Sequence, residues 1–393
     1  MLTPNRRQWL LGAAALASPL SLALAATAPN ARPDDARFVF VLLRGGLDGL
    51  AAVPAVGDSD FAAARGPLAQ FGAPPLALAG RAFALHPALA GLHGLYRSGE
   101  LAVVHATGLP YRERSHFDAQ QVLESGGSRP YELATGWLGR ALAASGNRSG
   151  LALTTAVPLV LRGSERIDTW APSALPEPTP DLLARLEFLY AGDTALAQAL
   201  ARAKALREQP GMNESAGNGA GRNAAVTLAR KAGEMLGAAQ GPRVAVLEMG
   251  GWDSHANQAA PGGALANNLR TLDAALSALR ESLGGAAWSR SVVVVATEFG
   301  REVAVNGTQG TDHGTGGAAF VLGGTVLGGR VITDWPGLAK AQRFEGRDLR
   351  ITTDLRGVLK GVLGDHLRVA KSVIEQSVFP ASASVPALAL LRA

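Results

Sequence analysis

Three apolar runs of β-forming residues each end at a group of glycines and polar residues. They occupy positions 37–43, 243–249 and 291–297, and stretches with helical spacing separate them along the chain. Runs that are apolar on both faces are typical of buried strands in a parallel sheet. Strands that alternate with helices predict one α/β domain, with a mostly parallel central sheet and helices on both of its faces.

The remaining chain predicts further elements of the same kind. Additional strands are expected at 101–108, 151–163 and 317–324, and helices at 86–100, 115–126, 179–209, 224–237, 264–284 and 352–367. We expect the domain to cover residues 34–393, with a helical insertion at about 179–240. Because the sheet of such a domain binds ligands beyond the carboxyl ends of its strands, those ends are where a site is expected.

Acids and histidines follow the three apolar runs. The candidate metal ligands are Asp48 after the first run, Asp253 and His255 after the second, Glu298 after the third, and Asp312 and His313 in the next loop. Carboxylates and imidazoles that meet at one edge of a sheet favour a divalent metal site. The chain has no cysteine, so the candidate ions are zinc, manganese, magnesium or calcium, and one or two of them are expected.

Each candidate ligand also has a structural interpretation. Asp48 fits a turn, Glu298 fits a salt bridge with Arg301, and Asp312 next to His313 fits a hydrogen bond on a surface loop. His105, at the end of the strand at 101–108, is a further candidate for the same edge. The placement of the acids and histidines at strand ends favours the site.

The segment "YRERSHFDAQ" places charged and nucleophilic side chains at the start of a helix. The candidate catalytic residues are Arg112, Arg114, Ser115 and His116. The amino end of a helix attracts anions, and neighbouring arginines add to that attraction. Ser115 is either the residue that caps this helix or a hydroxyl nucleophile in an anion pocket.

The first 25 residues resemble a signal peptide. Arg6 and Arg7 precede an apolar stretch that ends in small residues, which is the pattern of a twin-arginine (Tat) signal with cleavage near 25–28. We therefore expect the Tat export machinery as a partner and a periplasmic or extracellular mature protein with no membrane span. The net charge is only +5, and no basic run carries interleaved aromatics, so no nucleic acid partner is expected.

Five motifs in order resemble the domain-of-unknown-function 1501 family: "LLRGGLDGL", "RSHFDAQ", "GGWDSHANQ", "ATEFGRE" and "DHGTGG". That family is grouped with the alkaline-phosphatase-like superfamily of phosphatases and sulfatases. The resemblance implies metal ligands at Asp48, Asp253, His255 and His313, and a nucleophile at Ser115. It also implies an Asp-His pair at positions 298 and 299, where this chain has Glu298 and Phe299. The missing histidine puts a two-metal centre in doubt.

Two functions follow as hypotheses. The first is an exported metal-dependent hydrolase of phosphate or sulfate esters, acting on a small-molecule or glycan-linked anionic ester. The alternative is a non-catalytic periplasmic binding or assembly protein that retains the fold and a structural metal ion. Fold alone does not decide between them.

Overall fold

A nine-stranded sheet forms the centre of the molecule, in the order β10-β4-β9-β8-β1-β7-β5-β6, with β11 paired to β4. The computed structural model describes residues 35–146, 148–164, 166–172, 178–207, 224–258 and 262–392. The expected signal peptide and residues 208–223 lie outside the described residues. The strands are β1 (Arg37–Leu43), β4 (Leu101–Gly108), β5 (Gly150–Ala152), β6 (Ile167–Thr169), β7 (Val244–Met249), β8 (Ser291–Thr297), β9 (Gly317–Leu322), β10 (Arg330–Ile332) and β11 (Thr353–Asp354).

The central strands are parallel except for one. β1 pairs in parallel with both β7 and β8, whereas β9 runs antiparallel to its neighbours β8 and β4. The register aligns Leu43 with Met249 on one side and with Thr297 on the other. The three strands therefore end side by side. Because β9 is antiparallel, the β8–β9 loop returns along the same edge.

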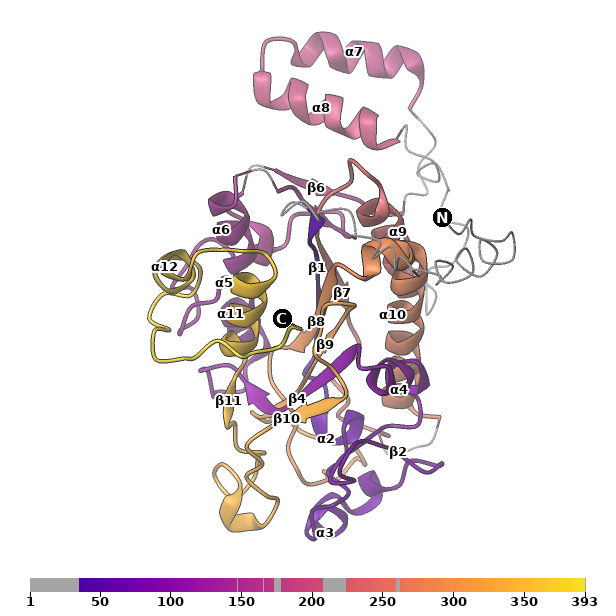
Figure 1. Ribbon diagram of the computed structural model, residues 1–393, viewed down its shortest axis with the longest axis vertical. Helices are drawn as coiled ribbons and strands as arrows, with labels where there is room; N and C mark the ends of the chain where they lie inside the picture. The colour runs from indigo at the N-terminus through magenta and orange to yellow at the C-terminus, as the bar shows by residue number, and fades with distance from the viewer. Residues whose placement is uncertain are drawn as a thin grey trace, which may run out of the picture. The chain divides into compact units, whose positions relative to one another are not determined.

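Helices cover both faces of this sheet (Figure 1). The helices are α2 (Gly49–Ala52), α3 (Phe61–Arg65), α4 (Ala90–Arg97), α5 (His116–Ser125), α6 (Trp137–Ala144), α7 (Pro180–Tyr190), α8 (Thr194–Arg207), α9 (Ala224–Gly237), α10 (Ala264–Trp288), α11 (Leu355–Asp365) and α12 (Lys371–Val373). Short helical turns are η2 (Gly66–Ala69), η3 (Leu159–Leu161), η4 (Lys340–Gln342) and η5 (Ile374–Val378), and a small hairpin joins β2 (Leu76–Ala77) to β3 (Ala84–Leu85).

Side chains of β1 alternate between two hydrophobic cores. Phe38, Phe40 and Leu42 pack in the core beneath α5, α6 and α11, whereas Val39 and Val41 pack in the core beneath α4, α9 and α10. Strand residues alternate between the faces of a sheet, so a run that is apolar throughout supplies both cores at once. The predicted α/β class, with a mostly parallel sheet between two helical layers, is confirmed.

One local prediction was wrong. The strand expected at 151–163 is only β5, because the chain leaves the sheet after Ala152 and forms η3 at Leu159–Leu161; Pro158 has no N–H with which to continue a ladder. The helical pattern expected at 179–209 forms two helices, α7 and α8, which pack on one another. Helix α9, from the same expected insertion, packs along α10.

The described residues include no helix that is both long and apolar enough to cross a membrane.

His86, His105 and His366 lie outside the strand-end group and are buried within the fold. His105 donates through Nε2 to the carbonyl of Val53 at 2.9 Å, and His366 does the same to Arg37 at 2.8 Å. Burial lowers the pKa of His105 and of His366 to about 4. His105 therefore belongs to the core and does not line the site edge.

These two imidazoles make the fold sensitive to acid. The unfolded chain binds their protons below pH 6.5, whereas the folded chain holds both rings neutral down to about pH 4. The free energy of unfolding should therefore fall as the pH drops from about 6.5 to about 4, by roughly 3 kcal/mol for each ring. Urea unfolding at a series of pH values, with a chelator present, measures this slope.

His366→Gln should flatten the slope, because the variant has one fewer buried ring to protonate. His93→Gln is the matched control, since His93 is not buried, and it should keep the wild-type slope. An unchanged slope in His366→Gln would contradict the assignment.

Candidate metal centre

Three ligand atoms converge at the carboxyl ends of the central strands. Within the described residues, His116, Asp253 and His313 form a group whose ligand atoms all lie within 4.8 Å of one another. The two Nε2 atoms of His116 and His313 are 3.0 Å apart, and Asp253 Oδ1 lies 3.4 Å from the first and 3.2 Å from the second. The group draws on α5, the loop after β7 and the loop before β9.

His255 contacts two of these three ligand atoms. Its Nε2 lies 3.0 Å from His313 Nε2 and 2.9 Å from Asp253 Oδ1. An ion bound tetrahedrally at 2.0–2.1 Å has ligands about 3.3 Å apart. The separations among His116, Asp253 and His313 match that value, and His255 adjoins the same edge. The geometry and the donor types therefore fit a divalent ion.

Hydrogen bonds at Nδ1 determine which nitrogen of each ring faces this point. His116 Nδ1 lies 2.8 Å from Glu298 Oε1, and His255 Nδ1 lies 3.1 Å from Asp312 Oδ1. His313 Nδ1 lies 3.0 Å from the carbonyl oxygen of Arg114. Ionised carboxylates and carbonyls only accept, so each Nδ1 carries a proton, and a ring in its neutral form turns its Nε2 lone pair to the common point. Facing lone pairs repel, and a cation between them removes that repulsion.

Glu298 is the acid that connects the loop after β1, the end of β8 and α5. Its Oε1 accepts from the Gly45 amide at 2.8 Å and from Gln120 Nε2 at 3.1 Å, besides His116. Its Oε2 accepts from Thr297. Burial alone raises the pKa of Glu298, but the hydrogen bond from His116 and the other donors outweigh it, so the net shift is downward. The same hydrogen bond raises the pKa of His116.

Gly45 allows the close approach of the β1 end to the loop that carries Asp253. Its φ is +120°, and a Cβ there would lie 2.5 Å from the Asp253 backbone nitrogen. A side chain would therefore both strain the backbone and push Asp253 out of the group. This glycine is the reason why the first strand can end directly against the second ligand loop.

Arg301 is paired with Asp253, and the pairing with Glu298 considered from the sequence does not occur. The guanidinium is fully buried, and its Nη1 donates to Asp253 Oδ1 at 2.7 Å. Burial alone raises the pKa of Asp253, but the hydrogen bond and charge of Arg301 outweigh it and bring the pKa to about 2. Asp253 is therefore ionised at any pH near neutrality, as a metal ligand requires.

Backbone hydrogen bonds join the two sides of the β8–β9 loop. Gly314 donates to Gly300, and Glu302 donates to Asp312 at 2.9 Å, so His313 lies opposite Arg301. Asn306 Nδ2 donates both to Asp312 Oδ1 at 3.0 Å and to the carbonyl of His255 at 2.9 Å. Asn306 therefore fastens the two ligand loops to each other. The hydrogen bond from Asn306 also lowers the pKa of Asp312.

Asp48 does not reach the group. Its carboxylate forms a fully buried ion pair with Arg65 at 2.5 Å, accepts from the Ala51 amide at the start of α2, and is bonded to Gln258. These contacts occupy both carboxylate oxygens. Of the metal ligands predicted from the sequence, the structure brings together Asp253, His255 and His313, and His116, predicted as a catalytic residue, joins them. Glu298 and Asp312 lie one hydrogen bond behind the ligand atoms.

The other three catalytic candidates have separate environments. Ser115 precedes α5, but its hydroxyl makes no capping hydrogen bond. Arg112 donates to the carbonyl of Leu109 at 2.8 Å. The Arg114 guanidinium is paired with Asp348 and Glu345. Neither arginine contacts the ligand group through its guanidinium.

Sequence reasoning missed three contributors: Gln120, Asn306 and the pairing of Arg301 with Asp253. Gln120 had a signal, because it lies four residues after His116 and so shares its helical face. Asn306 and Arg301 act across loops, and no local spacing marks such contacts.

A family model described as "Protein of unknown function (DUF1501)" matches residues 97–378. The chain belongs to this family. All four residues whose atoms converge, His116, Asp253, His255 and His313, fall inside the matched segment. No curated protein matches the chain.

Solved structures with weak likeness to this DUF1501 protein include a 2-O GAG sulfatase, with 11% identity, a TM-score of 0.45, and coverage of 90% of this chain and 73% of that one. The phosphonate monoester hydrolase of Agrobacterium radiobacter has 11% identity, a TM-score of 0.43, and coverage of 85% and 74%. Ps i-CgsB in complex with k-i-k-neocarrahexaose has 8% identity, a TM-score of 0.45, and coverage of 85% and 72%. At this level of likeness, the chemistry has to be argued from the site itself.

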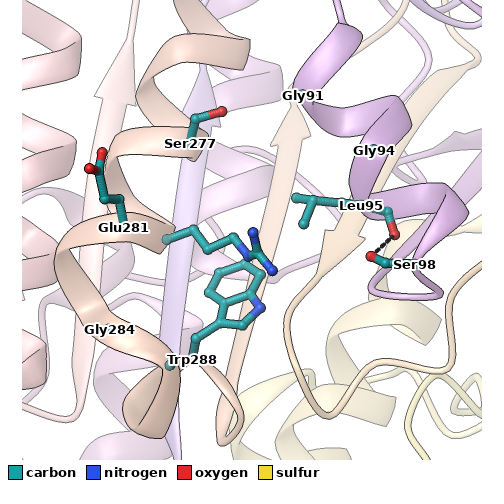
Figure 2. Close-up of a pocket in the computed structure, with 10 residues that line it drawn as sticks. Gly91, Gly94, Leu95, Ser98, Ser277, Glu281, Gly284 and Trp288 are labelled. Atoms are coloured by element: carbon teal, nitrogen blue, oxygen red, sulfur yellow. Dashed lines mark hydrogen bonds between the residues drawn. The ribbon is translucent and has the colours of Figure 1, made fainter.

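A separate cavity of about 600 Å³ lies between α4 and α10 (Figure 2). Leu95 and Trp288 line it, and the Arg280 guanidinium lies 5.6 Å from the Trp288 ring centre. Trp288 ends α10 just before β8 begins at Ser291, so this cavity is near the amino end of β8. The ligand group follows the carboxyl end of that strand. The cavity is therefore distinct from the candidate metal centre.

Replacing Asp48 separates its structural role from a ligand role. Asp48→Asn leaves Arg65 buried without its carboxylate, which should cost about 3 kcal/mol or more of unfolding free energy. Zinc affinity of the folded fraction should stay within about threefold of wild type, because Asp48 makes no contact with the ligand atoms. Denaturation curves and zinc titrations measure the two quantities; a zinc affinity that falls tenfold or more at full folding would return Asp48 to the ligand set.

Proposed function

We propose that the chain is an exported metal-dependent hydrolase of phosphate or sulfate esters. The observation that supports it most directly is the convergence of His116 Nε2, His313 Nε2 and Asp253 Oδ1, each ring held by a hydrogen bond at Nδ1. Imidazole nitrogens with one carboxylate favour zinc over magnesium or calcium, which prefer all-oxygen ligands. Manganese is the next candidate.

Exposure of the centre supports catalysis. The side chains of Asp253 and His255 are 44% and 45% exposed, so a substrate can reach the ligand atoms from solvent. A catalytic centre keeps one position open, and His116, Asp253 and His313 alone leave room for it. When bound, the ion polarises an ester oxygen and lowers the pKa of a hydroxyl or water.

The residues of the chain supply orientation and the nucleophile. Ser115, next to His116, has a hydroxyl that the helix does not use as a cap; it is the proposed nucleophile, with water as the alternative. The first N–H groups of α5 lack intrahelical partners and can donate to the oxygens of an anionic ester. The ion pair with Arg301 keeps Asp253 ionised.

The alternative, a binding or assembly protein with a structural ion, is supported by His255. With His255 the centre has four protein donors, which is the number found in closed structural sites. The two functions differ in what His255 does: an orienting or accessory group in the hydrolase, an obligatory fourth ligand in the structural site.

Metal binding should depend on the three convergent residues. Zinc or manganese titration of the chelated full-length protein should show one ion per chain. His116→Ala, Asp253→Ala and His313→Ala should each lose at least about a hundredfold in affinity, since each removes a direct ligand. His93→Ala serves as the control and should bind like wild type; equal affinity in all four variants would reject the centre.

Hydrolysis then separates the two functions. 4-Nitrophenyl phosphate and 4-nitrophenyl sulfate are assayed with the zinc- and manganese-loaded proteins. In the hydrolase, Ser115→Ala lowers kcat by about 10³-fold or more while metal affinity is unchanged, and His255→Ala retains the ion. Loss of the ion and of stability in His255→Ala, with no turnover in wild type, favours the structural site.

Export stays a proposal based on Arg6 and Arg7. The Tat route would place the mature chain in the periplasm or outside the cell, where a small-molecule or glycan-linked anionic ester would be its substrate. An Arg6→Lys, Arg7→Lys precursor should remain in the cytoplasm on fractionation; normal export of that variant would exclude the Tat route.

A further inference from the structure

Asp348 is a completely buried carboxylate outside the ligand group. It lies in the loop between η4 and β11. Its Oδ2 accepts from Arg114 Nε at 2.8 Å, and its Oδ1 lies 3.4 Å from Arg347 Nη1. The buried acid is therefore hydrogen-bonded to Arg114 through Oδ2 and lies at ion-pair distance from Arg347, while its Oδ1 makes no hydrogen bond.

Both of these arginines contact His313. The carbonyl oxygen of Arg114 accepts from His313 Nδ1 at 3.0 Å, and Arg347 Nη2 donates to the carbonyl oxygen of His313 at 2.9 Å. The first contact sets the ring and its tautomer, and the second sets the main chain that carries the ring. Asp348 is thus connected to both ends of one candidate ligand.

Arg114 has a strained backbone conformation, and two acids hold its side chain. Its φ is +62°, a left-handed conformation that residues other than glycine rarely adopt. The guanidinium is fixed by Asp348 and by Glu345, whose side chain is 58% exposed. Because a buried ionic contact is less screened than an exposed one, Asp348 is the stronger restraint on Arg114.

The loop that carries Asp348 is itself fixed. The amide of Asp348 donates to the carbonyl of Phe344 at 3.0 Å, and the amide of Phe344 donates back at 2.9 Å. Arg347 is held on its other side by Glu302 at 2.8 Å. These contacts fix the position of the Asp348 carboxylate relative to the two arginines.

We propose that Asp348 is the positioning residue for His313, which fixes the orientation and the Nδ1–H tautomer of that imidazole through Arg114 and Arg347. The inference rests on the proposed metal centre, because positioning matters there for presenting Nε2 to an ion. Partners that orient a ligand histidine typically contribute 10- to 100-fold to metal affinity.

The test compares two acids on the same arginine in the full-length protein. Asp348→Asn keeps the shape but removes the charge, and should weaken zinc binding 10- to 100-fold. Glu345→Gln is the matched control, since it removes the exposed partner of Arg114, and should change zinc affinity by less than about threefold. Equal zinc affinity in Asp348→Asn and wild type, or equal losses in both variants, overturns the proposal.

A readout without metal separates this inference from the proposed function. In ¹⁵N-histidine spectra of the metal-free protein, the His313 signals, identified by their loss in His313→Ala, should show protonated Nδ1 in wild type and mixed tautomers in Asp348→Asn. If the wild-type protein binds no zinc, the proposed metal centre is wrong, but this spectrum still tests whether Asp348 sets the tautomer of His313. An unchanged His313 tautomer in folded Asp348→Asn overturns the positioning role.

Arg347→Met is a second variant in case Asp348→Asn does not fold. It removes the donor to the His313 carbonyl and leaves the Asp348–Arg114 contact intact. It should weaken zinc binding in the same direction by a smaller factor, and an affinity equal to wild type overturns the second arm of the proposal.

Discussion

One buried carboxylate, Glu298, ties together the segments on which the rest of the site depends. It receives hydrogen bonds from the loop after β1, from the end of β8 and twice from α5. Such a group is costly to bury unless every lone pair is used, and here four donors use them. The position of α5, and with it the direction of His116, follows from that requirement.

A second chain of buried contacts fixes the other ligand loops. Asp253 is bonded to Arg301, whose Nε donates to Thr311, and Thr311 donates in turn to Gln258 at 2.7 Å. Gln258 then reaches Asp48, the partner of Arg65. Asp48 is the far end of this chain of contacts, and its ion pair with Arg65 contributes to the stability of the fold. A network of this kind is rigid because each member has one satisfied arrangement, and removing one leaves others unpaired.

The fold and part of the site were predictable from sequence for different reasons. Fully apolar strands and helical spacing are local signals, so the α/β sheet and the edge carrying Asp253, His255 and His313 followed from pattern. The pattern did not show which of the acids is a metal ligand and which acids support the ligand histidines. Glu298 and Asp312 have the same composition signal as Asp253, and only their hydrogen bonds to Nδ1 atoms show that they stand behind the rings. His116 was expected at the site, but as a catalytic group, since a helix start does not reveal where its ring points.

We expect one ion to bind where the three ligand atoms converge. A crystal structure of the zinc-loaded protein, with anomalous data collected on both sides of the zinc edge, would locate it. One strong peak should lie about 2.0–2.1 Å from His116 Nε2, His313 Nε2 and Asp253 Oδ1. No peak in this group, or a peak at Asp48 with none between the histidines, would contradict it.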